Sequence, residues 1–192
     1  MMSIDRAFAH FPSFRTERLL VRPLEASDAE AIFAIKSDPK VTEAYGTEPH
    51  KSVDETREWV EGRLNARGQR DSLFWVFVPM GEERAIGSCC YWQLDSGSRC
   101  AELGYELNRS YWGKGIMSEA LPPVLAYGFD AMQLNRIEAC PLAENAPSNA
   151  LLLKLGFRYE GNLKERVYFR GHFADQYYYG LLKSEWNPRT KG

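Results

Sequence analysis

The spacing of apolar residues predicts one strand and two helices in the first third of the chain. Residues 16–24 alternate between apolar and polar positions, which is typical of a half-buried strand. Residues 29–36 carry their apolar side chains on one helical face, and Pro39 interrupts this helix. A capping-box pattern at Ser52 predicts a second helix that extends to about Arg67.

A period of two residues takes over in the middle of the chain. Turn signals rich in Gly, Pro, Asp and Ser separate three runs with strand character, at 73–78, 85–94 and 99–107. Consecutive strands that are joined by such short turns pair in the antiparallel sense. The pattern therefore predicts a three-stranded antiparallel meander.

Helical and strand periods then alternate to the end of the chain. The predicted elements are a helix over 116–132, a strand over 135–140, a short helix over 149–155 that Ser148 caps, and strands over 167–171 and 176–182. Pro122 and Pro123 fall inside the first of these helices, so we expect a kink or a start shifted by one turn. With no repeat or linker, the pattern predicts one mixed α/β domain over residues 1–192.

The bulk composition excludes several classes of function. A chain of 192 residues with 44% hydrophobic content suits a single globular domain. Its net charge of −2 gives no overall attraction to polyanions, so we expect no nucleic-acid and no membrane partner. No apolar run approaches the roughly 18 residues of a membrane span, and the N-terminus shows no apolar signal core. We therefore expect a cytoplasmic protein.

The cysteines and histidines indicate neither a disulfide framework nor a metal site. The four cysteines, which show no C-x-x-C spacing, are Cys89, Cys90, Cys100 and Cys140. We expect them to be free, reduced thiols. The three histidines are scattered along the chain, at His10, His50 and His172. Without the spacing of metal ligands, they give no reason to expect a metal.

A loop with two glycines connects the third strand of the meander to the helix after it. Gly113 and Gly115 precede the predicted helix start near Ile116. The first N–H groups of a helix lack intrahelical partners, and the helix dipole adds partial positive charge there. Because glycine lets the backbone approach a ligand closely, this loop can hold a pyrophosphate by backbone alone. A plain tight turn would also use these glycines, and Ser118 stands where the dinucleotide fingerprint has its third glycine.

Three motifs occur in order along the chain. They are RTERLLVRPL at 15–24 with the following DAEAIF at 28–33, GYELNRSYWGKGIMSEAL at 104–121, and ENAPSNALLLKLGF at 144–157. Together they resemble the GCN5-related N-acetyltransferases (GNAT superfamily), and within them the bacterial ribosomal-protein N-terminal acetyltransferases. The resemblance implies a single-domain α/β fold with a mixed, mostly antiparallel sheet flanked by helices. It also implies a splay between the two central strands, near 105–107 and 138–140.

The resemblance implies an enzyme in which acetyl coenzyme A (acetyl-CoA) donates an acetyl group directly to an amine acceptor. The loop residues that would bind the pyrophosphate through backbone N–H groups are Gly113, Lys114, Gly115, Ile116, Met117 and Ser118. The strand residues that would pair with the pantetheine arm are Tyr105, Glu106 and Leu107. Asn145 would bond to this arm near the thioester. Direct transfer forms no covalent enzyme intermediate, so none of the cysteines needs a catalytic role.

Proton transfer requires a base for the amine and a donor for the leaving thiolate. Glu102 is the first candidate for the base, and Glu138 and Glu165 are weaker ones. Ser148 is the candidate donor, because Leu152 occupies the position at which many members of the superfamily have a tyrosine. The alternatives are an exposed strand charge for Glu102 and a plain helix cap for Ser148.

These motifs leave the acceptor open. The resemblance favours the N-terminal amine of a protein or peptide, although Val167 stands where some ribosomal-protein members keep a carboxylate. A small amine, such as a polyamine, an amino acid or an antibiotic, is the second interpretation. A non-catalytic domain that binds acyl-CoA is the third. Members of this branch often form dimers, so we also consider a homodimer.

Several side chains are candidates for the acceptor side. We place Tyr45, Trp92 and Tyr168 near the acceptor. We expect a loop over 45–52, in which His50 is either a proton relay or a solvated side chain.

Overall fold

The computed structural model describes residues 3–9 and 11–187, and one eight-stranded sheet organises this part of the chain. The strand order is β1-β2-β3-β4-β5-β6-β8-β7, and all neighbours are antiparallel except β5 and β6. The strands are β1 (Phe14–Arg15), β2 (Leu19–Pro23), β3 (Leu73–Pro79), β4 (Gly87–Asp95), β5 (Cys100–Leu107), β6 (Arg136–Ala139), β7 (Arg158–Phe169) and β8 (His172–Leu182). The helices are α1 (Ser3–Ala9), α2 (Ala29–Lys36), α3 (Pro39–Glu43), α4 (Val53–Gly68), α5 (Ile116–Asp130) and α6 (Ala146–Lys154). This arrangement confirms the predicted mixed α/β fold.

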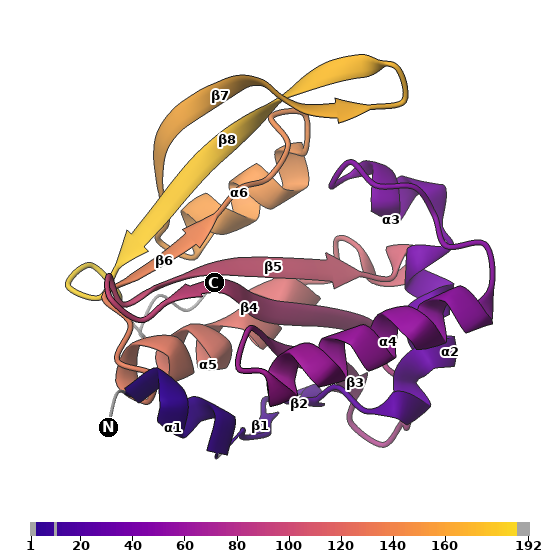
Figure 1. Ribbon diagram of the computed structural model, residues 1–192, viewed down its shortest axis with the longest axis horizontal. Coiled ribbons are helices and arrows are strands. Elements are labelled where there is room, and N and C mark those ends of the chain that lie inside the picture. The colour runs from indigo at the N-terminus through magenta and orange to yellow at the C-terminus, as the bar shows by residue number, and fades with distance from the viewer. Residues whose placement is uncertain (1–2, 10, 188–192) are drawn as a thin grey trace.

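Helices cover both faces of the sheet, and each face has its own apolar core (Figure 1). On one face, Trp75 and Phe77 of β3 belong to the core that includes the apolar side of α5. On the other face, Val76 and Val78 of the same strand pack with α2 and α4. Because successive strand residues point to opposite faces, the continuous apolar run of β3 is buried on both sides.

The two central strands, β5 and β6, pair over only part of their length. Their parallel register runs from Cys100 opposite Arg136 to Glu102 opposite Glu138. Beyond Glu102, residues 103–107 of β5 pair only with β4. The strands therefore diverge, as Figure 1 shows, and the predicted splay is confirmed.

Most of the predicted elements are present at the predicted places. The meander is formed by β3, β4 and β5, and the helix that follows the glycine loop begins at Ile116 without a shifted start. It continues through Pro122 and Pro123. The helix α2 ends at Lys36, before Pro39, as predicted. Pro39 also begins a further short helix, α3, which was not predicted, and the Asp38 side chain accepts a hydrogen bond at its start. Proline is tolerated there because the first helical N–H groups have no intrahelical partner.

Three other details differ from the prediction. Ser148 does not cap α6, because the side-chain oxygen of Asn145 accepts a hydrogen bond from the Ser148 N–H at 3.1 Å and caps the helix instead. The strand predicted to begin at 167 begins at Arg158. Its side chains are mostly exposed, so it lacks the apolar alternation on which the prediction relied. The short helix α1 was not predicted; its buried residues Ile4 and Ala7 pack on the main core.

Candidate active site

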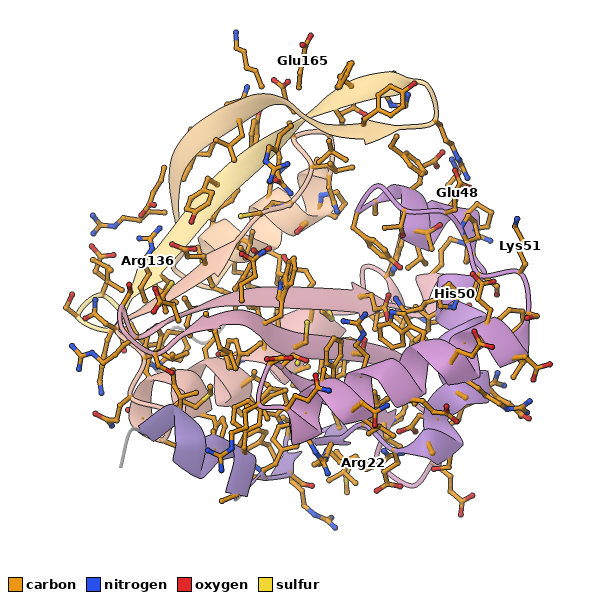
Figure 2. The ribbon with its side chains drawn as sticks, viewed as in Figure 1. Arg22, Glu48, His50, Lys51, Arg136 and Glu165 are labelled. Carbon is orange, nitrogen blue, oxygen red and sulfur yellow. The ribbon has the colours of Figure 1, made fainter. Side chains whose placement is uncertain are left out.

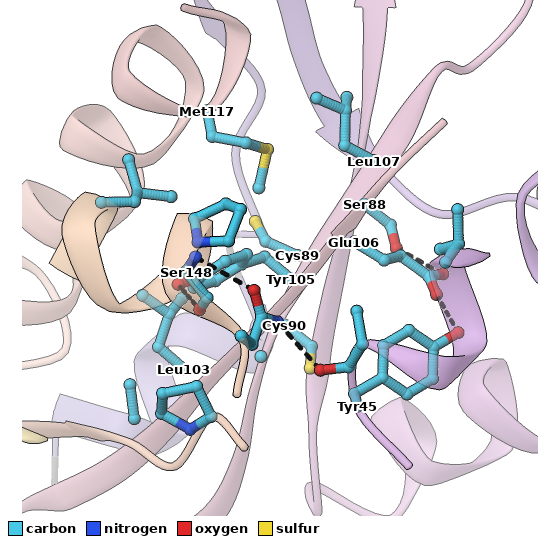
Figure 3. A pocket seen from close by; sticks show the side chains of 18 of the residues that line it. Tyr45, Ser88, Cys89, Cys90, Leu103, Tyr105, Glu106, Leu107, Met117 and Ser148 are labelled. Atoms are coloured by element: carbon cyan, nitrogen blue, oxygen red, sulfur yellow. Dashed lines mark hydrogen bonds between the residues drawn. The ribbon is translucent and has the colours of Figure 1, made fainter. Parts of the chain in front are cut away.

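A cavity of about 1090 Å³ lies where β5 and β6 diverge. Its walls come from α3, α4, α6, the strands β4 and β5, and the loop that leads into α5. Figure 3 shows part of the lining, with Ser148 on one side of β5 and Tyr45 on the other. Binding sites for small molecules commonly fall between about 300 and 1,000 Å³, so this cavity is large enough for an extended cofactor arm and a second reactant.

The loop before α5 has the backbone shape of an anion site. Gly113 has a φ of 71° and Gly115, the N-cap of α5, a φ of 74°. Both values lie in the left-handed region that favours glycine. Within the described residues, the N–H groups of Gly113, Lys114 and Gly115 donate to no other backbone group. A Cβ added at Gly113 would meet nothing within 4 Å, so the loop has open space beside it and fits a pyrophosphate.

A brace that the sequence did not reveal holds this loop. The Arg18 Nη1 group donates to the Lys114 carbonyl at 3.0 Å, and its Nε donates to the Glu119 carboxylate at 2.6 Å. The same carboxylate accepts the Arg18 backbone N–H at 2.7 Å. The loop is thereby fixed to the start of β2 on one side and to the first turn of α5 on the other. No local pattern could have indicated a contact between segments so distant in sequence.

Five of the six loop residues predicted to bind the cofactor line the cavity, and they are Gly113, Gly115, Ile116, Met117 and Ser118. Lys114 is not among the lining residues. Its Nζ lies 5.3 Å from the centre of the Tyr111 ring. The structure thus brings the loop backbone to the cavity and leaves the lysine side chain at its outer side.

The open edge of β5 forms one wall of the cavity. The three residues predicted to face the pantetheine arm, Tyr105, Glu106 and Leu107, all line it. The Leu107 carbonyl already accepts a hydrogen bond from the Trp112 indole Nε1 at 2.8 Å. Asn145 lines the cavity as well, and its amide group donates to the Ala44 carbonyl at 2.9 Å.

Ser148 and Tyr105 form a hydroxyl pair inside the cavity. Their oxygen atoms lie 2.6 Å apart, as the dashed line in Figure 3 shows. Burial raises the pKa of Tyr105 to about 12, so the phenol stays protonated at neutral pH. Leu152, at the superfamily's tyrosine position, is fully buried in the core and does not line the cavity. The side chain of Tyr105 is therefore a functional candidate that sequence reasoning, which used only its backbone, missed.

Glu102 lines the cavity on the same face of the sheet as Gly104 and Glu106. Burial, followed by the negative charge of Glu138, raises its pKa to about 7. A carboxyl group with this pKa can accept and release a proton at neutral pH. The sequence left open which face of the strand carries Glu102. The structure places it on the face that lines the cavity, where a base is needed.

Glu106 is the centre of a buried polar network. Its carboxylate accepts hydrogen bonds from the Lys36 ammonium at 3.0 Å, from the Tyr45 hydroxyl at 2.9 Å and from the Ser88 hydroxyl at 3.0 Å. Both members of the Lys36–Glu106 pair are about nine-tenths buried. The side chain of Glu106 therefore fixes α2 and α3 to β5, a role separate from the one predicted for its backbone.

The cysteines near the cavity are poor nucleophiles. All four cysteines are free. Burial raises the pKa of Cys90 to about 12 and that of Cys89 well above its ordinary value. Because the thiolate is the reactive form, these two side chains stay unreactive at neutral pH.

Four of the six remaining candidates lie outside the cavity lining. Glu138 pairs with Arg136 at 2.6 Å. His50 bonds to Thr56 at 2.8 Å, and burial lowers its pKa. Figure 2 shows Glu165 on the outer side of the β7–β8 hairpin, pointing away from the cavity. Tyr168 on this hairpin is also exposed, whereas Tyr45 and Trp92 line the cavity.

The described residues contain neither a metal-binding cluster nor a membrane-spanning helix. Within 3–9 and 11–187, no group of three or more His, Cys, Asp or Glu side chains could hold a metal ion. His10 lies outside these residues. Across the same part of the chain, every helix is too short or too polar to span a bilayer.

Comparison with known proteins gives a consistent result. Residues 18–158 match the family model described as an acetyltransferase (GNAT) domain. The chain is 38% identical over 173 residues to a Bacillus licheniformis protein named uncharacterized N-acetyltransferase p20, covering 89% of this chain and 96% of that protein. It is 31% identical over 130 residues to the [ribosomal protein uS5]-alanine N-acetyltransferase of Escherichia coli, covering 66% of each chain.

A solved structure agrees in fold. The RimJ protein of Mycobacterium smegmatis, solved in complex with a CoA-disulfide, superposes with a TM-score of 0.82 at 26% sequence identity. The alignment covers 90% of this chain and 88% of that protein. The resemblance to the ribosomal-protein acetyltransferase branch is thereby confirmed.

Proposed function

This chain belongs to the GNAT acetyltransferase family and is an acetyl-transferring enzyme, and we propose that it transfers the acetyl group of acetyl-CoA to the N-terminal amine of a protein or peptide. The observation that carries the proposal is the arrangement of the cavity. Three side chains face the space into which the glycine loop opens. They are Glu102, whose carboxyl pKa is raised, and the hydroxyl pair of Ser148 and Tyr105.

We assign the cosubstrate to the loop and strand that the resemblance indicated. The free backbone N–H groups of residues 113–118 would bind its pyrophosphate, with the dipole of α5 adding positive charge. The open edge of β5 at residues 105–107 would pair with the pantetheine arm, with Asn145 beside it. Lys114 would add a positive charge at the mouth of the site. When bound, acetyl-CoA supplies an acyl carbon that its thioester makes electrophilic.

The proposed base is Glu102. It accepts the proton that the amine loses as the new N–C bond forms, and its pKa of about 7 places enough of the carboxylate in the basic form at neutral pH. Ser148 donates a proton to the sulfur as the C–S bond breaks. Tyr105, whose hydroxyl lies 2.6 Å from that of Ser148, passes a proton to the serine and takes one up from solvent, while Glu102 releases the amine proton to solvent, so that the proton count closes. No cysteine takes part.

The relatives support the proposed acceptor and setting. The relatives with assigned acceptors include enzymes named for alanine and serine residues of ribosomal proteins, which supports a protein N-terminus and a cytoplasmic reaction. A non-catalytic acyl-CoA-binding domain would have no use for a base with a pKa near neutrality beside a hydroxyl pair. The homodimer stays a prediction.

One experiment tests this function. Isothermal titration with acetyl-CoA, followed by release of free thiol with N-terminal peptides and small amines, separates the interpretations. We expect binding, and thiol release with peptides that Glu102→Gln lowers at least about a hundredfold. Glu165→Gln, a substitution at an exposed glutamate outside the cavity, is the matched control and keeps full turnover. Release with small amines alone would overturn the assignment to a protein N-terminus, and binding without turnover would leave only the acyl-CoA-binding role.

A further inference from the structure

One cation on the lining of the cavity has no anionic partner. Arg63, on α4, lines the cavity. Its guanidinium carbon lies 5.2 Å from the centre of the Trp59 ring and 5.7 Å from that of Phe74. Its Nε is buried without a hydrogen bond, and no hydrogen bond or ion pair joins this side chain to another residue of the described chain.

The other lining cations differ from Arg63 in this respect. Lys36 is paired with Glu106 at 3.0 Å, and Lys40 is paired with Glu43 at 3.1 Å. A buried donor without a partner is unfavourable, and structures rarely keep one without a reason. The aromatic faces attract the charge of Arg63 but leave its buried Nε–H without an oxygen acceptor. A carboxylate is the group that a guanidinium binds best, because its two oxygens match two N–H donors.

Arg63 lies over the same face of the sheet as the proposed base, Glu102. Phe74, Cys90 and Gly104 are consecutive partners across β3, β4 and β5, so they form one row on the face that lines the cavity. Arg63 lies over the first member of this row, and its charge acts to lower the pKa of Cys90 against the larger effect of burial. Glu102 is the next residue of β5 on that face, beside the last member of the row.

The distance across this row limits the size of the acceptor. Adjacent strands lie about 4.8 Å apart, so β3 and β5 are separated by roughly 10 Å. Both residues line the cavity, Arg63 beside Phe74 of β3 and Glu102 on β5. An acceptor held by both would have its amine at Glu102 and an anionic group a few bonds away at Arg63.

We propose that Arg63 binds a carboxylate of the acceptor, so that the preferred substrates are amines with a carboxylate a few bonds from the reacting nitrogen. This inference rests on the proposed N-acetylation at Glu102. It places polyamines outside the substrate range, because they would bring further positive charge to an unpaired guanidinium. The carboxylate has two sources, a free amino acid or an acidic residue close to the N-terminus of a protein.

The test compares each acid with its neutral amide, in binding and in turnover. The peptide probes are a tetrapeptide with aspartate at its second position and the matching tetrapeptide with asparagine there. The small probes are alanine and alaninamide. We expect the enzyme to prefer the acid of one pair by about tenfold or more in kcat/KM, mainly through KM. The pair that shows the preference identifies the source of the carboxylate.

Substitutions at Arg63 complete the test. Arg63→Gln should remove the preference, Arg63→Lys should keep part of it, and both should bind acetyl-CoA as the wild type does. Arg57→Gln, a substitution on the same helix at an exposed residue that pairs with Asp54, should keep the full preference. Equal kcat/KM for acid and amide in both pairs, or a preference that survives in Arg63→Gln, would overturn the inference.

Titration of the same probes into the enzyme with coenzyme A bound gives a readout that does not depend on catalysis. We expect the acid to bind more tightly than its amide, and this difference to vanish in Arg63→Gln. An absence of turnover with every probe would count against the proposed function, whereas equal binding of acid and amide would count against the role of Arg63 alone.

Discussion

Glu102 of β5 and Glu138 of β6 are partners in the last pair of the parallel register, just before the two strands diverge. Glu138 does not line the cavity, yet its charge is the second cause, after burial, of the raised pKa of Glu102. A residue outside the cavity thus adjusts the proton affinity of the carboxyl group inside it.

Replacement of Glu138 by Gln should move the pH profile of the enzyme. Loss of the negative charge lowers the pKa of Glu102, so the acidic limb of kcat/KM should shift to lower pH by roughly half to one unit. Arg136 pairs with both Glu138 and Glu160, so Glu160→Gln is the matched control. The acidic limb of its kcat/KM profile should stay at the wild-type pH. An unshifted limb in Glu138→Gln would contradict the role of Glu102 as the base.

The raised pKa of Glu102 also predicts a pH-dependent stability. Its folded-state pKa of about 7 exceeds the ordinary value of 4.5, so its contribution to stability is fully present below about pH 4.5 and is lost as the pH rises through 7. Glu102→Gln cannot ionise and should therefore be more stable than the wild type at pH 8, on the order of 1–3 kcal/mol. Urea unfolding at pH 5 and pH 8 measures this, and a difference that does not grow with pH would contradict it.

Substitutions in the hydroxyl pair should separate catalysis from binding. Ser148→Ala removes the proposed proton donor and should lower kcat by about a hundredfold. Tyr105→Phe removes the group that returns the proton and should lower kcat by about tenfold. Both variants should keep the Kd for acetyl-CoA, measured by titration. Tyr159→Phe, at an exposed tyrosine, is the control, and an unchanged kcat in Ser148→Ala would contradict the assignment.

A valine in the glycine loop should abolish cosubstrate binding. Gly115 has a φ of 74°, which a β-branched residue adopts only with strain, so the loop backbone must change shape. We expect the Kd of Gly115→Val for acetyl-CoA to rise by about a hundredfold or more. Gly171→Val introduces the same strain at a φ of 83° in the β7–β8 turn. This control should lose a similar stability, on the order of 1–3 kcal/mol, and keep the Kd.

The buried pair of Lys36 and Glu106 should matter for stability. Glu106→Gln leaves a buried ammonium without its carboxylate and should lower the free energy of unfolding by about 3–5 kcal/mol. Arg170→Gln removes an exposed arginine that pairs with Glu43 and Glu48, and it should cost much less, because solvent screens exposed ion pairs. Denaturant unfolding measures both, and similar losses would contradict the distinction.

The sequence was sufficient for features that depend on local signals. The meander follows from residue periodicity and turn residues, and the loop at Gly113 and Gly115 from glycines before a helix. The start of β7 was missed because its exposed side chains remove the period-two signal, while pairing with β8 holds its backbone. The helix that begins at Pro39 was missed because proline both ends helices and begins them.

The contacts that build the site connect residues far apart in the chain. The Ser148–Tyr105 pair spans 43 positions, and the Lys36–Glu106 pair spans 70. Arg63 carries no local signal at all, since a lone arginine on an amphipathic helix is normally solvated. Such contacts depend on how helices pack on the sheet, and the local patterns of a single sequence do not determine that packing.

The bond between Arg18 and Glu119 closes a chain segment of 101 positions. Closure of so long a segment carries a large entropic penalty, which is offset only once the strands between its ends have paired. We therefore expect the loop that Arg18 braces to take its shape only after β2 to β5 have paired. A cosubstrate held by this loop would accordingly bind only the paired strands, and its binding free energy would add to the stability of the domain.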